Sequence, residues 1–500
     1  MRTWLMGMIA VAVLTLGLTP ETWAQGFPGG TEETLGPKFK DSGHRPAPRV
    51  PRRGSDALAV LHHWNGIAID ASGLDHTPVA PGETRIFGEQ LGPGRASRAM
   101  AIVHIAIFDA VNAIAGRYRP YTSLAPVSTP TSMQAAIAQA AHDTLIAVFS
   151  SQRASFDALL ATELREIPDG QAKTSGVALG RAAAAAILAL RAADGADHAE
   201  PRVGVEFITS EDPGKWRQDP ISLAPLALGV HWGGVRPFVL RSGDQFRAPK
   251  PPALHSLDFV DAFNDAKRLG GDGSVTPTER TADETFVGVF WAYDGTPSLC
   301  APPRLYNQIA AQIAGQMKSD VVELARLLAL VNVAMADAGI ATWESKYYYQ
   351  VGRPVTVIRE GGTGNPDATG DPAFAPLGAP ASNLNGPNFT PPFPAYPSGH
   401  AAFGGALFQT LRNFYRTDDI AFTFVSDEYN GITEDNAGVV RPLHPRTFST
   451  LSEAEEENGQ SRIFLGIHWS FDKTEGIAQG RRVADYVFRN AFLPLGTDSR

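Results

Sequence analysis

Residues 321–343 read VVELARLLALVNVAMADAGIATW. Apolar residues in this stretch recur at helical rather than alternating spacing, and Ala and Leu, which favour helices, are frequent. The stretch is therefore predicted to be a long helix. Other stretches are long enough for helices and have the same character, namely residues 101–115, 133–149, 174–193, 308–316, 401–414 and 472–492. Because strand signals are scarce by comparison, the sequence predicts an all-α fold.

Two internal matches indicate a duplication. Residues 331–338, VNVAMADA, match residues 103–110, VHIAIFDA, and residues 476–481, GIAQGR, match residues 176–181, GVALGR. The matches fall in the same order in both halves, which favours a duplicated helical bundle. Small residues such as these Gly and Ala also let helices approach closely, which is a simpler reason for their recurrence. The predicted division is an N-terminal bundle with an irregular segment over residues 56–255 and a C-terminal bundle over residues 256–495.

The composition is that of a globular protein without a disulfide framework. The chain has 500 residues, 43% of them hydrophobic and 19% charged, a net charge of -9 and a single cysteine. An acidic chain of this kind argues against a nucleic-acid partner, because such proteins usually carry a strongly basic face. The lone Cys300 excludes intrachain disulfides and multi-cysteine metal sites. It is interpreted as a buried small residue, because no neighbouring His supports a nucleophile.

The N-terminus has the pattern of a signal peptide. Arg2 supplies a positive charge, residues 5–18 are mostly apolar, and Thr22-Trp23-Ala24 places small residues before a cleavage site. Residues 1–24 are therefore predicted to be removed, and the protein to be periplasmic or extracellular. The apolar run is too short for a membrane span, and no later stretch is predicted to span a membrane. Residues 25–55, rich in proline, are predicted to be a linker or arm, with ordered structure beginning near Ser55.

Some local features can also be predicted. Thr276-Pro277-Thr278-Glu279 has the pattern of a capped helix start, so a helix is expected from there through Trp291. Residues 208–255 and 361–397 are rich in Pro and Gly without periodicity, and are predicted to be long loops of the kind that carry sites. Asp427-Glu428-Tyr429-Asn430-Gly431 lacks the spacing of a calcium loop and is interpreted as a solvated turn. The adjacent His62 and His63 are not expected to share a metal.

Residues able to hold an anion concentrate in the second half. Lys346 and Arg353 are seven residues apart, so on a continuous helix that ended at Pro354 both cations would project from one face. Ser398-Gly399-His400 places a hydroxyl, an unhindered N–H and an imidazole where a helix is expected to begin. Free N–H groups and the positive end of the helix dipole favour an anion there.

A third group follows Ser461-Arg462. His468 and Asp472 are four residues apart, so on a helix the carboxylate can accept the proton of one ring nitrogen and leave the other free as a nucleophile or ligand. With Lys346, Arg353, Ser398 and Gly399, residues Arg462 and His468 would form a pocket for a tetrahedral or bipyramidal oxyanion.

These three pieces resemble the signatures of a known superfamily. Lys-x6-Arg-Pro, Pro-Ser-Gly-His and Ser-Arg-x5-His-x3-Asp are shared by type 2 phosphatidic acid phosphatases, bacterial acid phosphatases and vanadium-dependent haloperoxidases, and all three are intact here in order. The resemblance implies an all-helical fold with two four-helix bundles. Because the first half has neither Pro-Ser-Gly-His nor a matching His-Asp pair, a single active site is expected, in the C-terminal bundle.

The resemblance also implies roles for the site residues. Vanadate would be bound with His468 as its axial ligand, oriented by Asp472, while Lys346, Arg353, Arg462, Ser398 and the Gly399 N–H would neutralise its oxygens. His400 would serve as acid–base when hydrogen peroxide enters, and Lys346 would polarise the oxidant for attack by halide, which yields hypohalous acid. In a phosphatase of the superfamily, His468 would instead attack phosphorus.

The haloperoxidase branch is favoured by the sequence around the signatures. Sixty residues separate His400 from Ser461, more than is usual in the phosphatases. Trp343 and Phe393 occupy positions that resemble the chloroperoxidase type, where they would line the halide position, although either could be ordinary core. Asp294, in Trp-Ala-Tyr-Asp-Gly, resembles an Asp that contacts one of the cofactor-binding arginines. The expected partners are hydrogen peroxide, a halide and a small organic acceptor, and the sequence carries no indication of an oligomeric state.

Two alternatives remain open at this point. One is an exported acid phosphatase that uses His468 as the nucleophile. The other is a non-catalytic helical protein that binds phosphate or vanadate, which is disfavoured because binding alone requires neither His400 nor the His468–Asp472 pair.

Overall fold

The structure is a computed structural model, and it describes residues 26–27, 29–45 and 54–496. The predicted signal peptide, residues 1–24, lies outside the described residues. The described chain is mostly helical, as predicted. Its first half contains helices α1 (Gly30–Thr34), α2 (Ala57–Asp75), α3 (Gly92–Ala115), α4 (Met133–Val148), α5 (Arg153–Arg165) and α6 (Gln171–Arg191).

The second half contains the remaining helices. They are α7 (Leu257–Gly270), α8 (Ala282–Phe290), α9 (Pro302–Gln316), α10 (Val321–Tyr349), α11 (Pro354–Glu360), α12 (Gly399–Tyr415), α13 (Leu451–Phe464) and α14 (Ser470–Asn490). Four short strands form two antiparallel pairs, β1 (Lys40–Asp41) with β2 (Leu384–Asn385) and β3 (Phe422–Phe424) with β4 (Arg446–Phe448). Four short 3₁₀ turns, at Ser150–Gln152, Trp232–Gly234, Gly243–Phe246 and Asp427–Tyr429, complete the elements.

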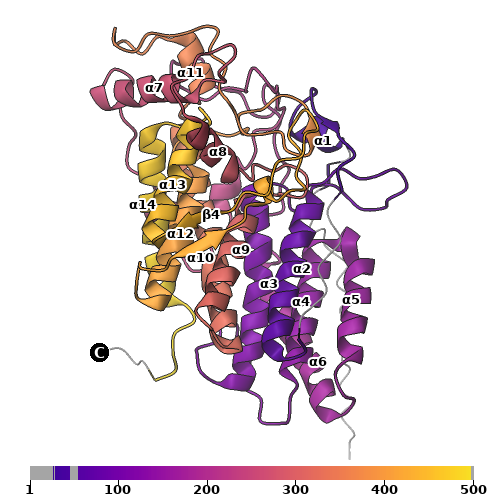
Figure 1. Cartoon of the computed structure of the whole chain (residues 1–500). Coiled ribbons are helices and arrows are strands. Elements are labelled where there is room, and N and C mark those ends of the chain that lie inside the picture. The colour runs from indigo at the N-terminus through magenta and orange to yellow at the C-terminus, as the bar shows by residue number, and fades with distance from the viewer. Residues whose placement is uncertain (1–25, 28, 46–53, 497–500) are drawn as a thin grey trace, which may run out of the picture.

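The central helix is α10, which carries the stretch that predicts the fold. Its first turn is closed by a capping box between Asp320 and Glu323, which satisfies the free N–H groups of the helix start. Helix α10 packs against α3 from the first half and α12 from the second. Figure 1 shows α2 to α6 on one side of the molecule and α10, α12, α13 and α14 on the other. One hydrophobic cluster contains side chains from both halves, from Val60 to Phe492.

Glycines allow close helix packing at equivalent places in the two halves. A Cβ on Gly176 or Gly180 of α6 would overlap the backbone of α4, and a Cβ on Gly476 or Gly480 of α14 would overlap the backbone of α12. Helices α4 and α12 are likewise both capped by a serine, Ser132 and Ser398. These parallels agree with the matches in the sequence, and the duplication itself stays a prediction.

The predicted helix start at Thr276 is wrong. Helix α8 begins at Ala282, where Thr281 and Glu284 form the capping box. Residues 274–276 form a turn instead, because the Asp272 carboxylate accepts hydrogen bonds from the backbone N–H groups of all three. Both Thr-x-x-Glu patterns are chemically suitable caps, and the Asp272 turn decides between them.

The prediction that ordered structure begins near Ser55 is also wrong. Helix α1 and strand β1 precede this residue, and β1 pairs with β2 in the register Lys40↔Asn385. Phe39 beside the strand is fully buried against Phe389, with the ring planes at 86°. The arm is therefore fixed to the loop of residues 361–397 by tertiary contacts that local periodicity does not reveal.

Among the described residues, three helices are long and apolar enough to cross a membrane by length and composition, so the prediction that no later stretch spans a membrane is not confirmed. They are α3, α6 and α10, and their most apolar windows are 89%, 33% and 100% buried inside the protein. The apolar surfaces of α3 and α10 are therefore covered by the protein itself.

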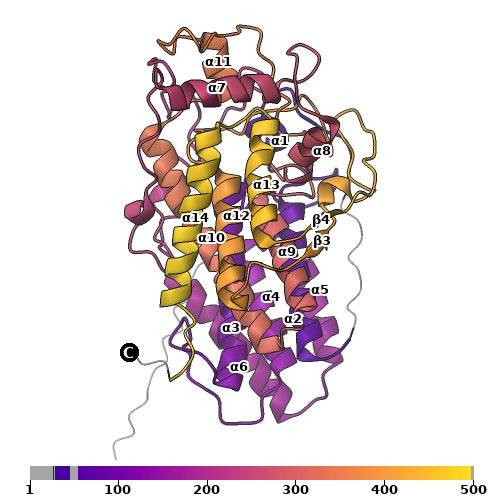
Figure 2. The same cartoon turned by 60° about the vertical axis from the view of Figure 1, so that its left-hand side comes forward.

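Irregular segments gather at one end of the long helices. Figure 2 shows α7, α8, α11 and the connecting loops at this end, together with the upper ends of α12 and α14. The loop of residues 361–398 contains no helix and only the two-residue strand β2, as expected for a Pro-rich segment. All the sequence signatures of the anion pocket fall at or near this end.

Candidate active site

The predicted site residues come from several separate elements and loops that the fold brings together. Lys346 lies in the last turn of α10, Ser398 caps α12, Arg462 lies in the last turn of α13, and His468 precedes α14. All of these side chains are buried.

The continuous helix predicted for Lys346 and Arg353 is not present. Helix α10 ends at Tyr349 because Gln350 adopts a left-handed conformation, with φ of 52°. Arg353 is the N-cap of α11, so Pro354 begins a helix rather than ending one. The two cations approach because residues 350–353 turn, and not because they share a helical face.

Lys346 is fixed by two backbone carbonyls. Its Nζ donates to the oxygens of Pro394 at 2.7 Å and Ala395 at 2.8 Å, which leaves one of its three N–H groups for another acceptor. The ammonium lies 5.2 Å from the ring centre of Phe393 and 5.6 Å from that of Trp343. Burial, with a smaller effect of Arg353, holds the pKa of Lys346 well below its ordinary value.

Arg353 has one guanidinium nitrogen without a partner. Its Nε donates to the Phe393 oxygen at 2.9 Å, and its Nη1 donates to the Ile467 oxygen at 2.8 Å and lies 2.9 Å from His468 Nε2. Nη2 is buried and makes no hydrogen bond to any part of the chain that the structure describes. Burial lowers the pKa of Arg353 to about 9.

Arg462 offers the second set of donors. Both oxygens of Asp294 accept from its Nη2, at 2.7 and 2.8 Å, as the resemblance implies for this Asp. Its Nε and Nη1 are buried and find no acceptor among the described residues. Burial raises the pKa of Asp294, and the Arg462 charge opposes this increase.

His468 is held in one tautomer, although it does not lie on a helix. It precedes α14, whose third residue is Asp472, and Asp472 Oδ2 lies 2.8 Å from His468 Nδ1 and 3.0 Å from the Trp469 backbone nitrogen. Oδ2 already accepts from the Trp469 N–H, and Arg353 Nη1 can only donate to Nε2, so Nδ1 carries the proton and the lone pair of Nε2 faces Arg353. Burial and then the Arg353 charge lower the pKa of His468, and burial raises that of Asp472 to about 7.

His400 is held in the opposite tautomer. Its Nε2 contacts the carbonyl oxygen of Ala292, so Nε2 carries the proton and Nδ1 keeps a lone pair. Burial, together with the Arg462 charge, lowers the pKa of His400 well below its ordinary value. The adjacent Gly399 is the first residue of α12, and a Cβ there would lie 3.3 Å from the Trp343 ring.

A cavity joins some of these groups to apolar walls, although Lys346, Arg353 and Ser398 are not among its lining residues. Arg462, His468, His400 and Gly399 line it together with Trp343 and Phe393, whose ring centres are 4.9 Å apart. Sequence reasoning missed the rest of the apolar lining, which comes from the arm, from both halves and from the Pro-rich loop, and includes Leu35, Leu91, Leu226, Leu228, Pro391 and Pro392. No local pattern distinguishes these residues from ordinary core.

The arrangement is suited to a small oxyanion. Three guanidinium nitrogens without an acceptor among the described residues, the third N–H of the Lys346 ammonium and a helix start supply donors, and a neutral imidazole supplies a lone pair. Buried donors without acceptors are costly, so a bound anion such as vanadate would satisfy groups that the protein leaves unsatisfied. The donor set therefore fits the group that the sequence implies.

Comparison with known proteins agrees with this geometry. Residues 326–494 match a family described as the VCPO second helical-bundle domain. The vanadium chloroperoxidase of Curvularia inaequalis is 30% identical over 519 residues, which cover 85% of this chain and 81% of that protein. The chain belongs to the vanadium haloperoxidase family.

Solved structures show the same fold as this family member. A bacterial vanadium-dependent iodoperoxidase aligns with a TM-score of 0.69 at 23% identity, over 89% of this chain and 99% of that one. The apo form of a bacterial vanadium-dependent chloroperoxidase aligns with a TM-score of 0.61 at 16% identity, over 80% and 94% of the two chains.

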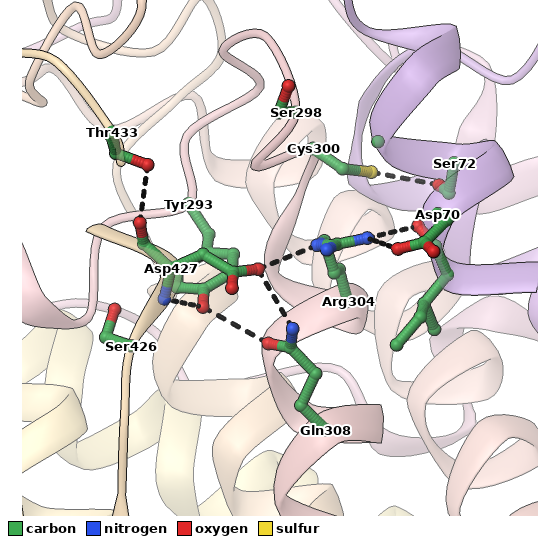
Figure 3. Close-up of polar contacts among 12 residues, drawn as sticks. Asp70, Ser72, Tyr293, Ser298, Cys300, Arg304, Gln308, Ser426, Asp427 and Thr433 are labelled. Atoms are coloured by element: carbon green, nitrogen blue, oxygen red, sulfur yellow. Dashed lines mark hydrogen bonds and ion pairs between the residues drawn. The ribbon is translucent and has the colours of Figure 1, made fainter. Parts of the chain in front are cut away.

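Asp427, interpreted from the sequence as part of a solvated turn, is instead one centre of a half-buried polar network. Its Oδ2 accepts from Arg304 Nε and from Gln308 Nε2, both at 2.9 Å (Figure 3). The next residue, Glu428, is fully buried and pairs with Arg441. The acidic and polar residues of this segment suggested exposure to solvent, but Arg304 and Arg441 form ion pairs with Asp427 and Glu428.

The environment of Cys300 also differs from expectation. His76 does lie near the thiol, with Nε2 at 4.0 Å from Sγ. His76 Nδ1 donates to the backbone carbonyl oxygen of Ser72, and its Nε2 accepts from the Gly92 backbone nitrogen. Neither ring nitrogen is therefore available as a base. Burial raises the pKa of the thiol, and the thiol is therefore inert for a different reason from the one inferred.

Proposed function

We propose that this protein is a vanadate-dependent haloperoxidase that uses hydrogen peroxide to oxidise a halide to hypohalous acid. The observation that carries the proposal is a set of buried donors, Arg353 Nη2 and Arg462 Nε and Nη1, that have no acceptor in the part of the chain that the structure describes and that lie beside the lone pair of His468. Family membership and the apolar wall of Trp343 and Phe393 support it. Bound vanadate would supply Lewis-acid activation of hydrogen peroxide.

Each residue then has a defined task. His468 Nε2 would bind vanadium, and Asp472 would keep the proton on Nδ1 so that this lone pair points to the site. Arg353, Arg462, Lys346, Ser398 and the Gly399 N–H would hold the oxygens. His400 would accept a proton at Nδ1 from incoming hydrogen peroxide, because its Nε2 is committed to Ala292.

The test compares the two activities of the superfamily in one preparation. Apoprotein would be titrated with orthovanadate by calorimetry, and the loaded protein assayed for peroxide-dependent halogenation of a dione dye with chloride, bromide and iodide. We expect halogenation with at least one halide and a clear stabilisation by vanadate, since a ligand at a hundred times its Kd adds about 2.7 kcal/mol to stability.

Hydrolysis of an aryl phosphate is measured in parallel. Phosphatase activity that is lost in His468→Ala, without halogenation at any halide, would establish the acid phosphatase instead. Binding of vanadate with neither activity would establish a non-catalytic binding protein. A small organic acceptor would be identified from the halogenated product.

We also propose that the protein is exported to the periplasm or the medium. The proposal rests on the charge, apolar run and small residues of positions 1–24. N-terminal sequencing of the secreted protein should find Gln25 as the first residue, and an intact Met1 in the mature protein would contradict export by cleavage.

A further inference from the structure

Residues 291–300 form a backbone segment that touches the site at two points. The carbonyl oxygen of Ala292 accepts the proton of His400 Nε2, and two residues later Asp294 accepts two hydrogen bonds from Arg462. The segment thus sets which nitrogen of His400 is free and where the Arg462 guanidinium lies. Neither Lys346 nor Arg353 depends on it, because carbonyls of residues 393–395 and 467 hold these two cations.

This segment is conformationally strained. Tyr293, Ser298 and Cys300 all have left-handed backbones without being glycine, with φ of 46°, 67° and 58°. Each such residue costs about 1 kcal/mol or more, so the conformation persists only where surrounding contacts hold it. Tyr293, which lies between the two residues that contact the site, Ala292 and Asp294, therefore needs contacts that hold its backbone in this conformation.

The side chain of Tyr293 provides these contacts. Its phenol accepts from the Asp427 backbone nitrogen at 2.6 Å and donates to Gln308 Oε1 at 3.2 Å, and its ring is fully buried. Gln308 and Arg304 both donate to Asp427 Oδ2, so the three side chains on α9 and the 427 turn close around the phenol (Figure 3).

Arg304 extends this network to the N-terminal half. Its Nη1 donates to the Ile69 oxygen at 2.6 Å and to Asp70 Oδ1 at 3.2 Å, both on α2. The carboxylates of Asp427 and Asp70 outweigh the effect of burial and raise the pKa of Arg304, so the guanidinium remains charged. Helix α2, which carries none of the predicted cofactor ligands, is thereby joined to the segment that touches the site.

We infer that Tyr293, Arg304 and Asp427 are positioning residues that hold segment 291–300, so that Ala292 fixes the tautomer of His400 and Asp294 fixes Arg462. The inference rests on the proposed function only for the identity of the anion that Arg462 holds. It assigns the N-terminal half a part in the site through Arg304, in addition to its structural role.

The first test reads the tautomer directly, without turnover. In protein with ¹⁵N-labelled histidine, the His400 signals, assigned by comparison with His400→Gln, should show a proton on Nε2. In Tyr293→Phe, which keeps the buried ring and removes the hydroxyl, these signals should move toward a mixture of the two tautomers. Tyr121→Phe is the matched control, because it removes a phenol hydrogen bond to the Phe238 oxygen, outside the segment.

The second test measures vanadate binding to apoprotein by calorimetry. Loss of a group bonded directly to a metal ligand weakens metal affinity about 10- to 100-fold. Tyr293 and Arg304 act one contact further from the ligands, so we expect a loss of about 10-fold for Tyr293→Phe and for Arg304→Lys. In a double variant with Asp294→Asn, Tyr293→Phe should cause little further loss of vanadate affinity. In a double variant with Lys346→Met, the two losses of affinity should add in full, because Lys346 is held by other residues.

The outcomes separate this inference from the proposed function. Unchanged His400 signals in Tyr293→Phe, or effects equal to those of Tyr121→Phe, would overturn the positioning role. If wild-type protein binds no vanadate, the proposed function fails, and the tautomer measurement still decides the inference. A change in the His400 signals of Tyr293→Phe alone supports it in either case.

Discussion

Two histidines at the site hold their protons on opposite nitrogens. His468 donates from Nδ1 to Asp472, and His400 donates from Nε2 to the Ala292 carbonyl. Asp472 Oδ2 also accepts from the Trp469 nitrogen, and the Ala292 oxygen is a carbonyl, so the neighbouring residue decides which ring nitrogen keeps its lone pair. The unprotonated Nε2 of His468, which accepts from Arg353 Nη1 in this structure, suits a metal ligand, and the free Nδ1 of His400 suits a general base.

His400→Ala should separate binding from turnover. Vanadate affinity measured by calorimetry should remain within a fewfold of wild type, because Lys346, Arg353, Arg462 and His468 do not depend on the imidazole. Halogenation should fall by about 10² to 10⁴, the usual contribution of a general acid–base. Loss of vanadate binding in this variant would show that His400 is a cofactor ligand instead.

A buried carboxyl should make stability depend on pH. Asp75 is fully buried at the end of α2, its oxygens accept from the Glu89 and Gln90 nitrogens, and burial raises its pKa from 3.8 to about 7. The folded protein then binds a proton between these two pKa values that the unfolded chain releases. The stabilisation that this proton on Asp75 contributes to the free energy of unfolding is complete below pH 3.8 and is lost as the pH rises through 7.

Urea unfolding of wild type and Asp75→Asn at pH 5 and pH 8 measures this effect. The wild type should lose about 2 to 3 kcal/mol relative to the variant between these pH values, since each unit of pKa shift corresponds to about 1.4 kcal/mol. Parallel stability profiles for the two proteins would mean that Asp75 is ionised throughout.

At the scale of elements, glycine spacing decides how closely α14 approaches α12. A Cβ on Gly480 would overlap the Ala402 carbonyl oxygen, whereas a Cβ on Gly315, in the last turn of α9, would meet nothing within 4 Å. Both residues are helical, so their intrinsic preference for alanine is the same and only the surroundings differ.

Gly480→Ala should therefore lower the free energy of unfolding by about 1 to 3 kcal/mol through overpacking. Gly315→Ala, the matched control, should raise it by about 0.5 to 1 kcal/mol, because alanine has less backbone entropy to lose. Chemical denaturation of both variants gives the two values, and equal effects would show that α12 and α14 separate readily.

At the scale of the whole molecule, the two halves share one core. Helix α10 is buried on every side and packs against α3, and a single cluster runs through both bundles. The cavity likewise takes Leu35 and Leu91 from the first half and His400 from the second. Neither half covers its own apolar surface.

Residues 256–495 expressed alone should therefore fail to fold. The apolar face of α10 that α3 covers would be exposed, and we expect aggregated protein without vanadate binding, measured by solubility and calorimetry. Co-expression with residues 25–255 is the matched control and should restore soluble protein. A soluble, vanadate-binding C-terminal half would show that the predicted boundary separates two independent domains.

The helical class and the residues that could hold an anion follow from the amino-acid sequence alone. Long stretches rich in Ala and Leu predict helices from local physics, and three signatures name the charged side chains. Two predicted helix boundaries were wrong, because a local pattern does not show which of two possible hydrogen-bonding arrangements forms in the folded protein. Thr281 rather than Thr276 caps α8, and Pro354 starts a helix rather than ending one.

How most of those side chains act depends on the folded arrangement. The tautomer of His468 depends on Asp472, which is only four residues away and which the sequence spacing indicates. The tautomer of His400 depends instead on Ala292, and the network around Asp427 depends on Arg304 and Gln308, all of them far away in the sequence. Hydrogen bonds and charges act over a few ångströms in space, so a carbonyl at position 292 can fix a proton at position 400. Local periodicity carries no information about such pairs, and packing of the two halves around α10 supplies it.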